Sequence, residues 1–82
     1  MFYTYVLRSL KKNILYKGST ENLNQRLEQH NNGLVTFTSK FKPWKLVYHE
    51  TFTTRAEAMA REKFFKSGKG REWLKNVIEK SS

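Results

Sequence analysis

Cysteine is absent from the 82-residue sequence. Disulfides and cysteine-based zinc sites are therefore excluded, and at this length folding buries only about two-thirds of the surface of the extended chain. We expect one small domain over residues 1–82, stabilised by aliphatic and aromatic packing, and the aromatic content of 15% suits such a core.

Long hydrophobic runs are also absent. No stretch approaches the roughly 20 apolar residues that a membrane-spanning helix requires. The N-terminal segment MFYTYVLRSLKK has no basic region ahead of its apolar residues, as a secretory signal peptide would have. The sequence therefore predicts a cytoplasmic protein without a membrane anchor.

Acidic residues are few. Seven Asp and Glu stand against sixteen Lys and Arg, which gives a net charge of +9 and a pI near 10.1. A small domain this basic indicates a polyanionic partner, usually nucleic acid. The weaker alternative is that the lysines only confer solubility. Composition does not distinguish DNA from RNA, or binding from cleavage.

Familiar catalytic patterns are missing as well. The sequence has no glycine-rich phosphate loop, no paired cysteines and no His-x-x-x-His zinc spacing, and its two histidines suggest no Ser/His/Asp arrangement. The options that remain for a hydrolytic site in this chain are Tyr, Arg, Glu and a metal ion.

Three segments show the alternation of apolar, aromatic and β-branched residues that is typical of strands. They are residues 2–8, 13–18 and 45–52, and the polar turn SLKKN makes the first two a β-hairpin. Residues 34–44, LVTFTSKFKPW, are rich in Thr, Ser and Lys and are expected to form a surface loop.

A first helix is expected after the hairpin, with Ser19 or Thr20 as its N-cap. Leu23 and Leu27 lie four residues apart and form its buried stripe, and Gly33 follows its end.

A second helix is expected to begin at the capping box of Thr54 and Glu57 and to break at Gly68. A last helix over residues 71–80 places Trp73, Val77 and Ile78 at helical spacing over the core. The order β-β-α-β-α-α predicts an α+β fold, a small three-stranded antiparallel sheet flanked by helices.

Tyr16 and Gly18 close the second strand and point to the same face of it. We expect the glycine to clear the surface beside the phenol of Tyr16, with Tyr5 alongside on the paired strand. The alternative is that Tyr16 is simply a good strand former and Gly18 a strand terminator. For Tyr16 taken alone, that alternative is the better interpretation.

Arg26 and His30 lie four residues apart on the first helix, beside its leucine stripe, so we place both at the rim of the core. An arginine there can clamp a phosphate through two parallel hydrogen bonds. An ordinary surface arginine is the commoner case, and a histidine near a helix C-terminus can equally interact with the helix dipole.

Glu62 borders apolar neighbours on the second helix, at helical spacing from Met59 and Phe65. A carboxylate in such surroundings costs free energy unless it pairs or binds a cation. It can bind a hard divalent ion such as Mg²⁺. A salt bridge to Lys66 at i+4 explains it at least as well.

The order of these residues resembles the GIY-YIG nuclease superfamily, specifically its small single-domain members. The segment YTY (residues 3–5) stands where the family's first triplet falls, and YKG (residues 16–18) where the second falls. Arg26 and His30 stand where the family has its helix arginine and, in many members, a following histidine. Glu62 stands where the family has its metal-binding glutamate.

The sequence departs from the family pattern at several positions. Tyr3 replaces the glycine of the first triplet, and Thr4 and Lys17 occupy middle positions that are usually aliphatic. Some members carry a late polar residue, often Asn, near the site, and Asn76 is the only candidate here. The positions that matter most for chemistry are all present, which argues against an inactive copy.

The resemblance implies hydrolysis of phosphodiester bonds with one divalent ion, Mg²⁺ or Mn²⁺, held by Glu62. Tyr16 would act as general base, and Arg26 would grip the phosphate oxygens. Tyr5 and His30 would position the attacking water or relay a proton. Non-specific contacts to the nucleic-acid backbone would come from Lys17, Lys40, Lys42, Lys66, Lys69 and Arg71.

The leading hypothesis is a metal-dependent DNA endonuclease, structure-selective or weakly sequence-specific, acting in DNA repair or recombination. A non-catalytic DNA- or RNA-binding module of the same fold is the second, and a small interaction protein is the third. Glu62 favours the first over the second because a carboxylate repels phosphate in plain binding. No feature of the sequence decides between a monomer and a homodimer.

Overall fold

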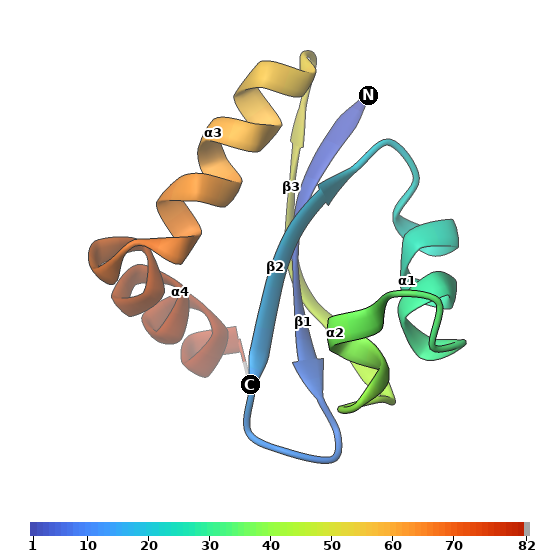
Figure 1. The fold of residues 1–82 in the computed structure, drawn as a ribbon. Helices are drawn as coiled ribbons and strands as arrows, with labels where there is room; N and C mark the ends of the chain where they lie inside the picture. The colour runs from blue at the N-terminus through green and yellow to red at the C-terminus, as the bar shows by residue number, and fades with distance from the viewer. Residues whose placement is uncertain (82) are drawn as a thin grey trace.

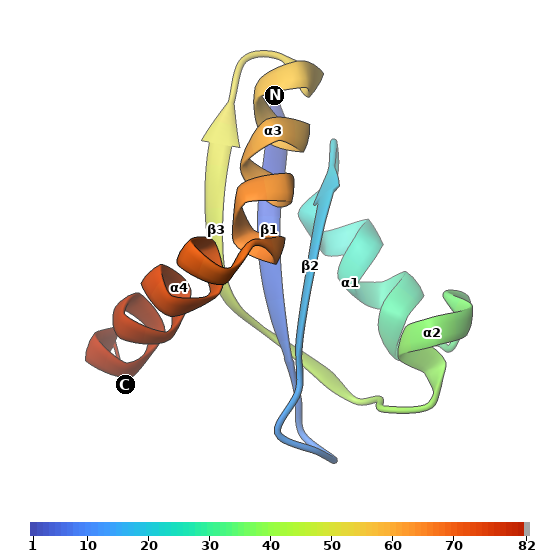
Figure 2. The same ribbon diagram turned by 60° about the vertical axis from the view of Figure 1, so that its left-hand side comes forward.

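The computed structural model describes residues 1–81 and shows a three-stranded antiparallel sheet between two layers of helices (Figures 1 and 2). The strands are β1 (Phe2–Ser9), β2 (Leu15–Thr20) and β3 (Trp44–Phe52), in the order β2-β1-β3. One face is covered by α1 (Leu23–Asn31) and α2 (Thr36–Ser39), and the other by α3 (Arg55–Lys66) and α4 (Gly68–Ser81). The predicted α+β class and the order β-β-α-β-α-α are confirmed, and α2 is one additional short turn.

Alternation along the central strand β1 sends neighbouring side chains into two separate cores. One core contains Val6, Phe65, Leu74 and Ile78, and the other contains Tyr5, Leu7 and Trp44. Burying side chains of this size stabilises a fold by about 1.5–3 kcal/mol each. The sheet therefore has a mainly apolar core under α3 and α4, where the buried hydroxyl of Thr4 donates to the carbonyl of Ala58, and a core with a buried tyrosine under α1 and α2.

The start of α1 differs from the prediction. Strand β2 continues through Ser19 and Thr20, so neither is the N-cap. Asn22 caps the helix instead, with its side-chain oxygen accepting from the backbone amide of Gln25 at 3.1 Å. The prediction was wrong because the strand pairs with β1 as far as Thr20 opposite Tyr3, and this pairing outweighs the capping preference of its hydroxyl residues.

The segment predicted to be a surface loop contains α2, and one of its residues is buried. Thr38 is fully enclosed, and its carbonyl accepts a hydrogen bond from the indole of Trp44 at 2.9 Å. The polar composition of the segment suggested exposure, but tertiary contacts with α1 and the start of β3 decide its structure.

The two C-terminal helices meet almost without a connection. As predicted, Thr54 caps α3, accepting from the amide of Glu57 at 3.2 Å. Helix α4 begins at Gly68, earlier than expected. Leu74 and Ile78 form its buried stripe, whereas Trp73, which was expected to cover the core, is more than one-third exposed. Within residues 1–81, no helix has the length and apolar content needed to cross a lipid bilayer.

Candidate active site

The hydroxyl of Tyr5 is the centre of a polar cluster on the α1 face of the sheet. Tyr5 lies directly opposite Gly18 in the β1–β2 pair, and the residue is 2% exposed. A Cβ placed on Gly18 would lie 2.5 Å from the Tyr5 hydroxyl oxygen, which is far inside van der Waals contact. Gly18 therefore makes room for Tyr5, its cross-strand partner, and the expectation that it clears space beside Tyr16 was wrong.

His30 is buried, with no exposed surface, rather than standing at the rim of the core as expected. Its Nε2 lies 3.0 Å from the Tyr5 hydroxyl, and its Nδ1 lies 2.7 Å from the hydroxyl of Thr38. Desolvation, with a smaller contribution from the positive charge of Arg26, lowers the pKa of His30 from 6.5 to about 4. The imidazole is therefore neutral at pH 7.

The hydrogen bonds around His30 can all be assigned a donor and an acceptor without conflict. Arg26 has only donors to offer, and its Nε lies 3.4 Å from the Tyr5 oxygen. Thr38 donates to the carbonyl of Val35 at 3.3 Å. Tyr5 can then donate to Nε2 of His30, and the Nδ1–H of His30 can donate to Thr38. This arrangement keeps the hydroxyl of Tyr5 protonated, and burial likewise raises its pKa.

Tyr16 lies over the same cluster and is only half buried. Its ring centroid is 4.9 Å from that of His30 and 6.2 Å from those of Trp44 and Phe37. Phe37, on α2, is 57% exposed and extends the aromatic surface beyond Tyr16. Tyr16 is therefore the tyrosine of the cluster that is more accessible to a ligand.

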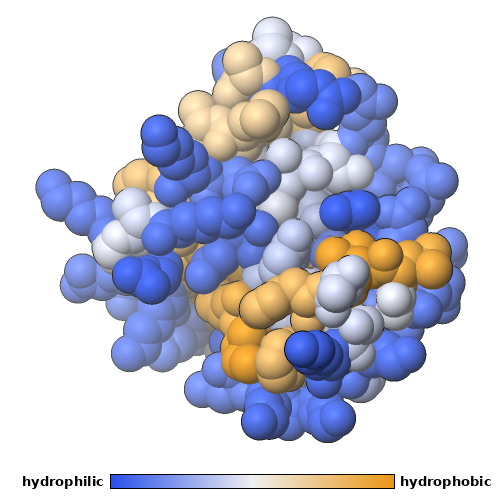
Figure 3. All heavy atoms as spheres, viewed as in Figure 1, coloured by the Kyte–Doolittle hydropathy of each residue, from blue (hydrophilic) through white to orange (hydrophobic). Residues whose placement is uncertain are grey.

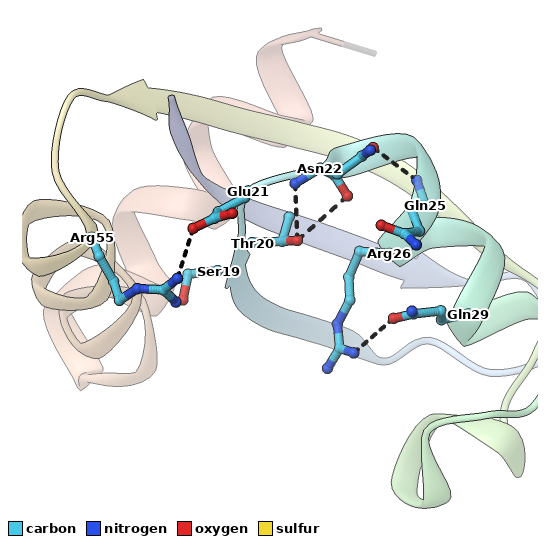
Figure 4. Close-up of a pocket in the computed structure, with 8 residues that line it drawn as sticks. All are labelled: Ser19, Thr20, Glu21, Asn22, Gln25, Arg26, Gln29 and Arg55. Atoms are coloured by element: carbon cyan, nitrogen blue, oxygen red, sulfur yellow. Dashed lines mark hydrogen bonds and ion pairs between the residues drawn. The ribbon is translucent and has the colours of Figure 1, made fainter.

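Arg26 connects this cluster to an open polar pocket of about 570 Å³ (Figure 4). The pocket is lined by Ser19, Thr20, Glu21, Asn22, Gln25, Arg26, Gln29 and Arg55. Hydrogen bonding to Tyr5, and to a smaller extent to Tyr16, raises the pKa of Arg26. Its Nη1 donates to Gln29 at 2.9 Å, so the guanidinium is held at the pocket by partners on both sides.

Arg55 reaches the same pocket from the start of α3 and was missed in the sequence (Figure 4). Its guanidinium pairs with Glu21 at 2.8 Å. Position 55 lies far from Arg26 in the chain, and only the packing of α3 against the sheet brings the two arginines to one pocket. No short-range pattern in the sequence indicates this.

Glu62 approaches the cluster from the other layer of helices. Its Oε2 accepts from Lys66 at 2.7 Å, so the predicted i,i+4 salt bridge forms. Its charge nevertheless extends to the tyrosine cluster, since it is among the groups that raise the pKa of Tyr5, although its contribution is the smallest. Helix α3 packs against both β1 and the edge strand β2, which explains this proximity.

The donor set of Glu62 fits a hard divalent ion held through one carboxylate. Among the described residues no group of three or more His, Cys, Asp or Glu side chains converges on one point. Mg²⁺ is commonly bound by one or two carboxylates, with substrate phosphates and water completing its shell. Glu62 can serve in this way, provided that Lys66 releases it or shifts to a phosphate.

The basic residues expected to contact nucleic acid fall into separate groups. Lys17 lies on the opposite face of β2 from Tyr16, and the charges of Arg71 and Lys66 contribute to the lowering of its pKa after desolvation. Lys69 is exposed at the start of α4. Lys40 and Lys42 are exposed in the segment after α2. Asn76 is exposed on α4, and nothing in the structure gives it a role.

These features match a known family. Residues 1–76 match the GIY-YIG catalytic domain. The chain belongs to the GIY-YIG nuclease family. Tyr5, Tyr16, Arg26 and His30, at the positions implied by the resemblance, form one contiguous cluster, and Glu62 acts on it through its charge.

Several GIY-YIG relatives cover nearly the whole chain. A UPF0213 protein of Clostridium perfringens is 39% identical over 82 residues, which is 99% of this chain and 87% of that protein. Another from Pediococcus acidilactici is 42% identical over 77 residues, covering 90% and 78%. The solution NMR structure of a UPF0213 protein from Bacillus halodurans superimposes with a TM-score of 0.56 at 28% identity, covering 94% of this chain and 85% of that one.

The burial of His30 predicts a loss of stability in acid. A histidine that is neutral when folded, with a pKa near 4, destabilises the fold as the pH falls below the unfolded value of 6.5. The loss stops growing once the folded histidine also protonates, so it develops between pH 6.5 and 4 and reaches about 2.5 kcal/mol at pH 4.5. Urea unfolding at pH 7 and pH 4.5 measures it.

The control separates His30 from the other titrating groups. His30→Asn is expected to be less stable than wild type at pH 7 but to lose about 2.5 kcal/mol less between pH 7 and pH 4.5. His49→Asn changes an exposed histidine and should keep the wild-type pH dependence. Equal pH dependence in all three proteins would contradict the assignment.

Proposed function

We propose that this protein is a metal-dependent endonuclease that hydrolyses phosphodiester bonds of DNA. The observation that supports it most strongly is the contiguous cluster of Tyr5, Tyr16, Arg26 and His30, open to solvent through Tyr16 and the polar pocket beside Arg26. A neutral histidine, two phenols and a fixed guanidinium are suited to placing a phosphate and a water molecule against each other.

Each residue of the cluster has a separable task in this proposal. Arg26 lies at the pocket and binds the non-bridging oxygens of the scissile phosphate. Tyr16 is the accessible phenol and, after losing its own proton to solvent, would act as the phenolate that takes the proton of the attacking water. Tyr5 stays protonated and is a positioning residue, because its hydroxyl is shared between Arg26 and His30.

Glu62 would hold the divalent ion, Mg²⁺ or Mn²⁺, which would supply charge stabilisation to the phosphate during cleavage. Lys66 now pairs with Glu62 and would be free to contact a neighbouring phosphate once the ion takes its place. Recognition of DNA structure, or weak sequence preference, as in repair or recombination, is part of the proposal, because lysines and arginines that contact the phosphate backbone carry no sequence information.

Cleavage assays on matched substrates test the proposal. Supercoiled plasmid, a branched junction, single-stranded DNA and single-stranded RNA are incubated with Mg²⁺ or Mn²⁺ in single-turnover conditions. Glu62→Gln is expected to lower the cleavage rate at least about 100-fold while leaving the affinity in EDTA within about two-fold of wild type. Arg26→Lys should lower the rate by a similar factor because a lysine cannot form two parallel hydrogen bonds.

Glu72→Gln provides the matched control, since it removes one carboxylate from an exposed position of α4. It should cleave like the wild-type protein. Salt-sensitive binding without any metal-dependent cleavage would reject the proposal in favour of a non-catalytic nucleic-acid-binding module. Equal cleavage by Glu62→Gln would reject Glu62 as the metal ligand.

A further inference from the structure

A second pocket lies on the opposite side of β2 from the tyrosine cluster, between the β1–β2 hairpin and α4. Its volume is about 350 Å³, and its lining includes four cationic side chains and one carboxylate, Glu79. The cations are Arg8, Lys17, Arg71 and Lys75. We propose that this basic pocket binds a backbone phosphate of the nucleic-acid strand, away from the site of cleavage.

The sequence builds the pocket from two regular elements. Arg8 faces Leu15 across the β1–β2 pair, and Lys17 faces Val6, so the two cations lie diagonally on the face that packs against α4. On α4, Arg71 and Lys75 are one turn apart and project beside the buried stripe of that helix. Strand alternation and helix periodicity thus bring together charges from widely separated positions.

The cations of the pocket outnumber its one carboxylate, so the lining carries net positive charge. The guanidinium of Arg71 and the ammonium of Lys66 both act to lower the pKa of Lys17, in addition to desolvation. Arg8 has a buried Nε without a hydrogen-bond partner among the described residues. Crowded like charges and an unsatisfied donor both cost free energy in the unliganded protein, and an oxyanion in the pocket offsets the repulsion between the charges.

The floor and position of the pocket favour a nucleic-acid strand as the source of the phosphate. Leu15 and Ile78 give it an apolar floor, against which a sugar can pack while the cations surround the phosphate. Lys17 lies between Tyr16 and Gly18 in the edge strand β2, so the pocket and the candidate active site share that strand. Figure 3 shows the molecule from the side seen in Figure 1, with hydrophilic residues over much of the surface and hydrophobic patches below the centre and at the right. A strand lying over the β2 edge can be held at one phosphate by Arg26 and at another by the basic pocket.

This inference rests on the nucleic-acid binding of the proposed function, but not on cleavage. The affinity of fluorescein-labelled single-stranded and duplex 12-mers is measured by anisotropy in EDTA at several salt concentrations. Lys75→Ala and Arg71→Ala are each expected to weaken binding about five- to tenfold. Each should also reduce the slope of log affinity against log salt concentration by about one. Lys80→Ala removes the same charge from an exposed position of α4 outside the pocket and should change affinity less than about two-fold.

A second readout reports on the pocket itself. The pKa of the Lys17 ammonium, followed by NMR, should rise when the 12-mer is bound, because a phosphate offsets the repulsion of Arg71 and Lys66. Inorganic phosphate at high concentration should shift the pKa of Lys17 in the same direction. An unchanged Lys17 pKa at saturation with the 12-mer, or equal affinities for Lys75→Ala, Arg71→Ala and Lys80→Ala, would overturn the inference.

These outcomes separate the inference from the proposed function. If wild type binds and cleaves DNA but Lys75→Ala behaves like Lys80→Ala, only the phosphate pocket is rejected. If the pocket variants bind weakly and wild type does not cleave, the pocket stands and the endonuclease is rejected. If wild type binds no nucleic acid, both are rejected.

Discussion

Replacement of Gly18 by alanine is expected to destabilise the fold by about 4 kcal/mol and to abolish cleavage. The new methyl group would lie 2.5 Å from the hydroxyl oxygen of Tyr5 and 2.6 Å from its Cζ. Tyr5 is buried between the sheet and α1 and cannot swing into solvent. It has to shift within the core, which costs about 1–3 kcal/mol for overpacking, and a comparable amount for the lost hydrogen bond to His30.

Two measurements test the expected effects of Gly18→Ala on the fold and on the Tyr5–His30 hydrogen bond. Urea unfolding at pH 7 gives the change in stability, and the ¹⁵N shifts of the His30 ring report whether its Nε2 still accepts a hydrogen bond. Ser19→Ala, at the adjacent position of β2, is the control and should alter neither by a measurable amount. Adding Tyr5→Phe to Gly18→Ala removes one of the two close contacts, so the double variant should regain part of the stability lost in Gly18→Ala.

A small effect would contradict the close approach seen in the structure. If Gly18→Ala unfolds within about 0.5 kcal/mol of wild type, Gly18 is only a strand terminator, as the sequence alone also allowed. If stability falls but cleavage by the folded fraction is unchanged, Tyr5 and His30 are packing residues and the catalytic cluster reduces to Tyr16, Arg26 and Glu62.

The strands and long helices were predictable because their signals are local. The alternation in β1 and the capping residue Thr54 depend on neighbours a few residues away, and both were confirmed. The N-cap of α1 was misplaced because strand pairing, a contact with β1, extends β2 over Thr20. Competition between a local preference and a long-range contact cannot be resolved from one sequence.

His30 illustrates the same limit within the candidate site. Its spacing from Arg26 placed it at the rim of the core, whereas the structure buries it completely, and this burial depends on Thr38 of α2. That turn lies in a segment whose composition indicates a loop. This burial changes the chemistry expected of His30. In place of a residue that relays a proton, His30 is a neutral imidazole that holds the hydroxyl of Tyr5.

Glu62 and the basic pocket differ in how far the sequence could reveal them. Glu62 was noticed for its apolar neighbours, and the resemblance favoured a metal-binding role for it, since a glutamate with a lysine at i+4 is otherwise an ordinary salt bridge. Lys17 and Arg71 were predicted as separate backbone contacts. Only the packing of α4 shows that they converge, and that Arg8 and Lys75 join them.

Replacement of Gly70 by alanine is expected to cost about 4 kcal/mol or more, because a Cβ there would lie 1.8 Å from the carbonyl oxygen of Phe64. That obstacle is backbone and cannot rotate away, so α4 would have to separate from the end of α3. The amide of Gly70 donates to the hydroxyl of Ser67 at 3.1 Å, which fixes the turn between the helices. Displacing α4 would also loosen Leu74 and Ile78 from the core.

Gly68 offers a matched control two residues away. A Cβ at Gly68 meets nothing within 4 Å, and alanine at the start of a helix is neutral to slightly stabilising, by up to about 0.5 kcal/mol. Both variants are compared by thermal and urea unfolding. Similar stabilities for Gly68→Ala and Gly70→Ala would show that the junction of α3 and α4 is looser than the structure indicates.

The same pair of variants links the junction to function. Helix α3 carries Glu62 and α4 carries Arg71 and Lys75, so the α3–α4 junction near Gly70 sets the position of the proposed metal ligand relative to the basic pocket. At a temperature where both variants are folded, Gly70→Ala should bind the 12-mer less tightly than Gly68→Ala. Equal binding would mean that the strand is held by the α1 side of the sheet alone, through Arg26 and its pocket.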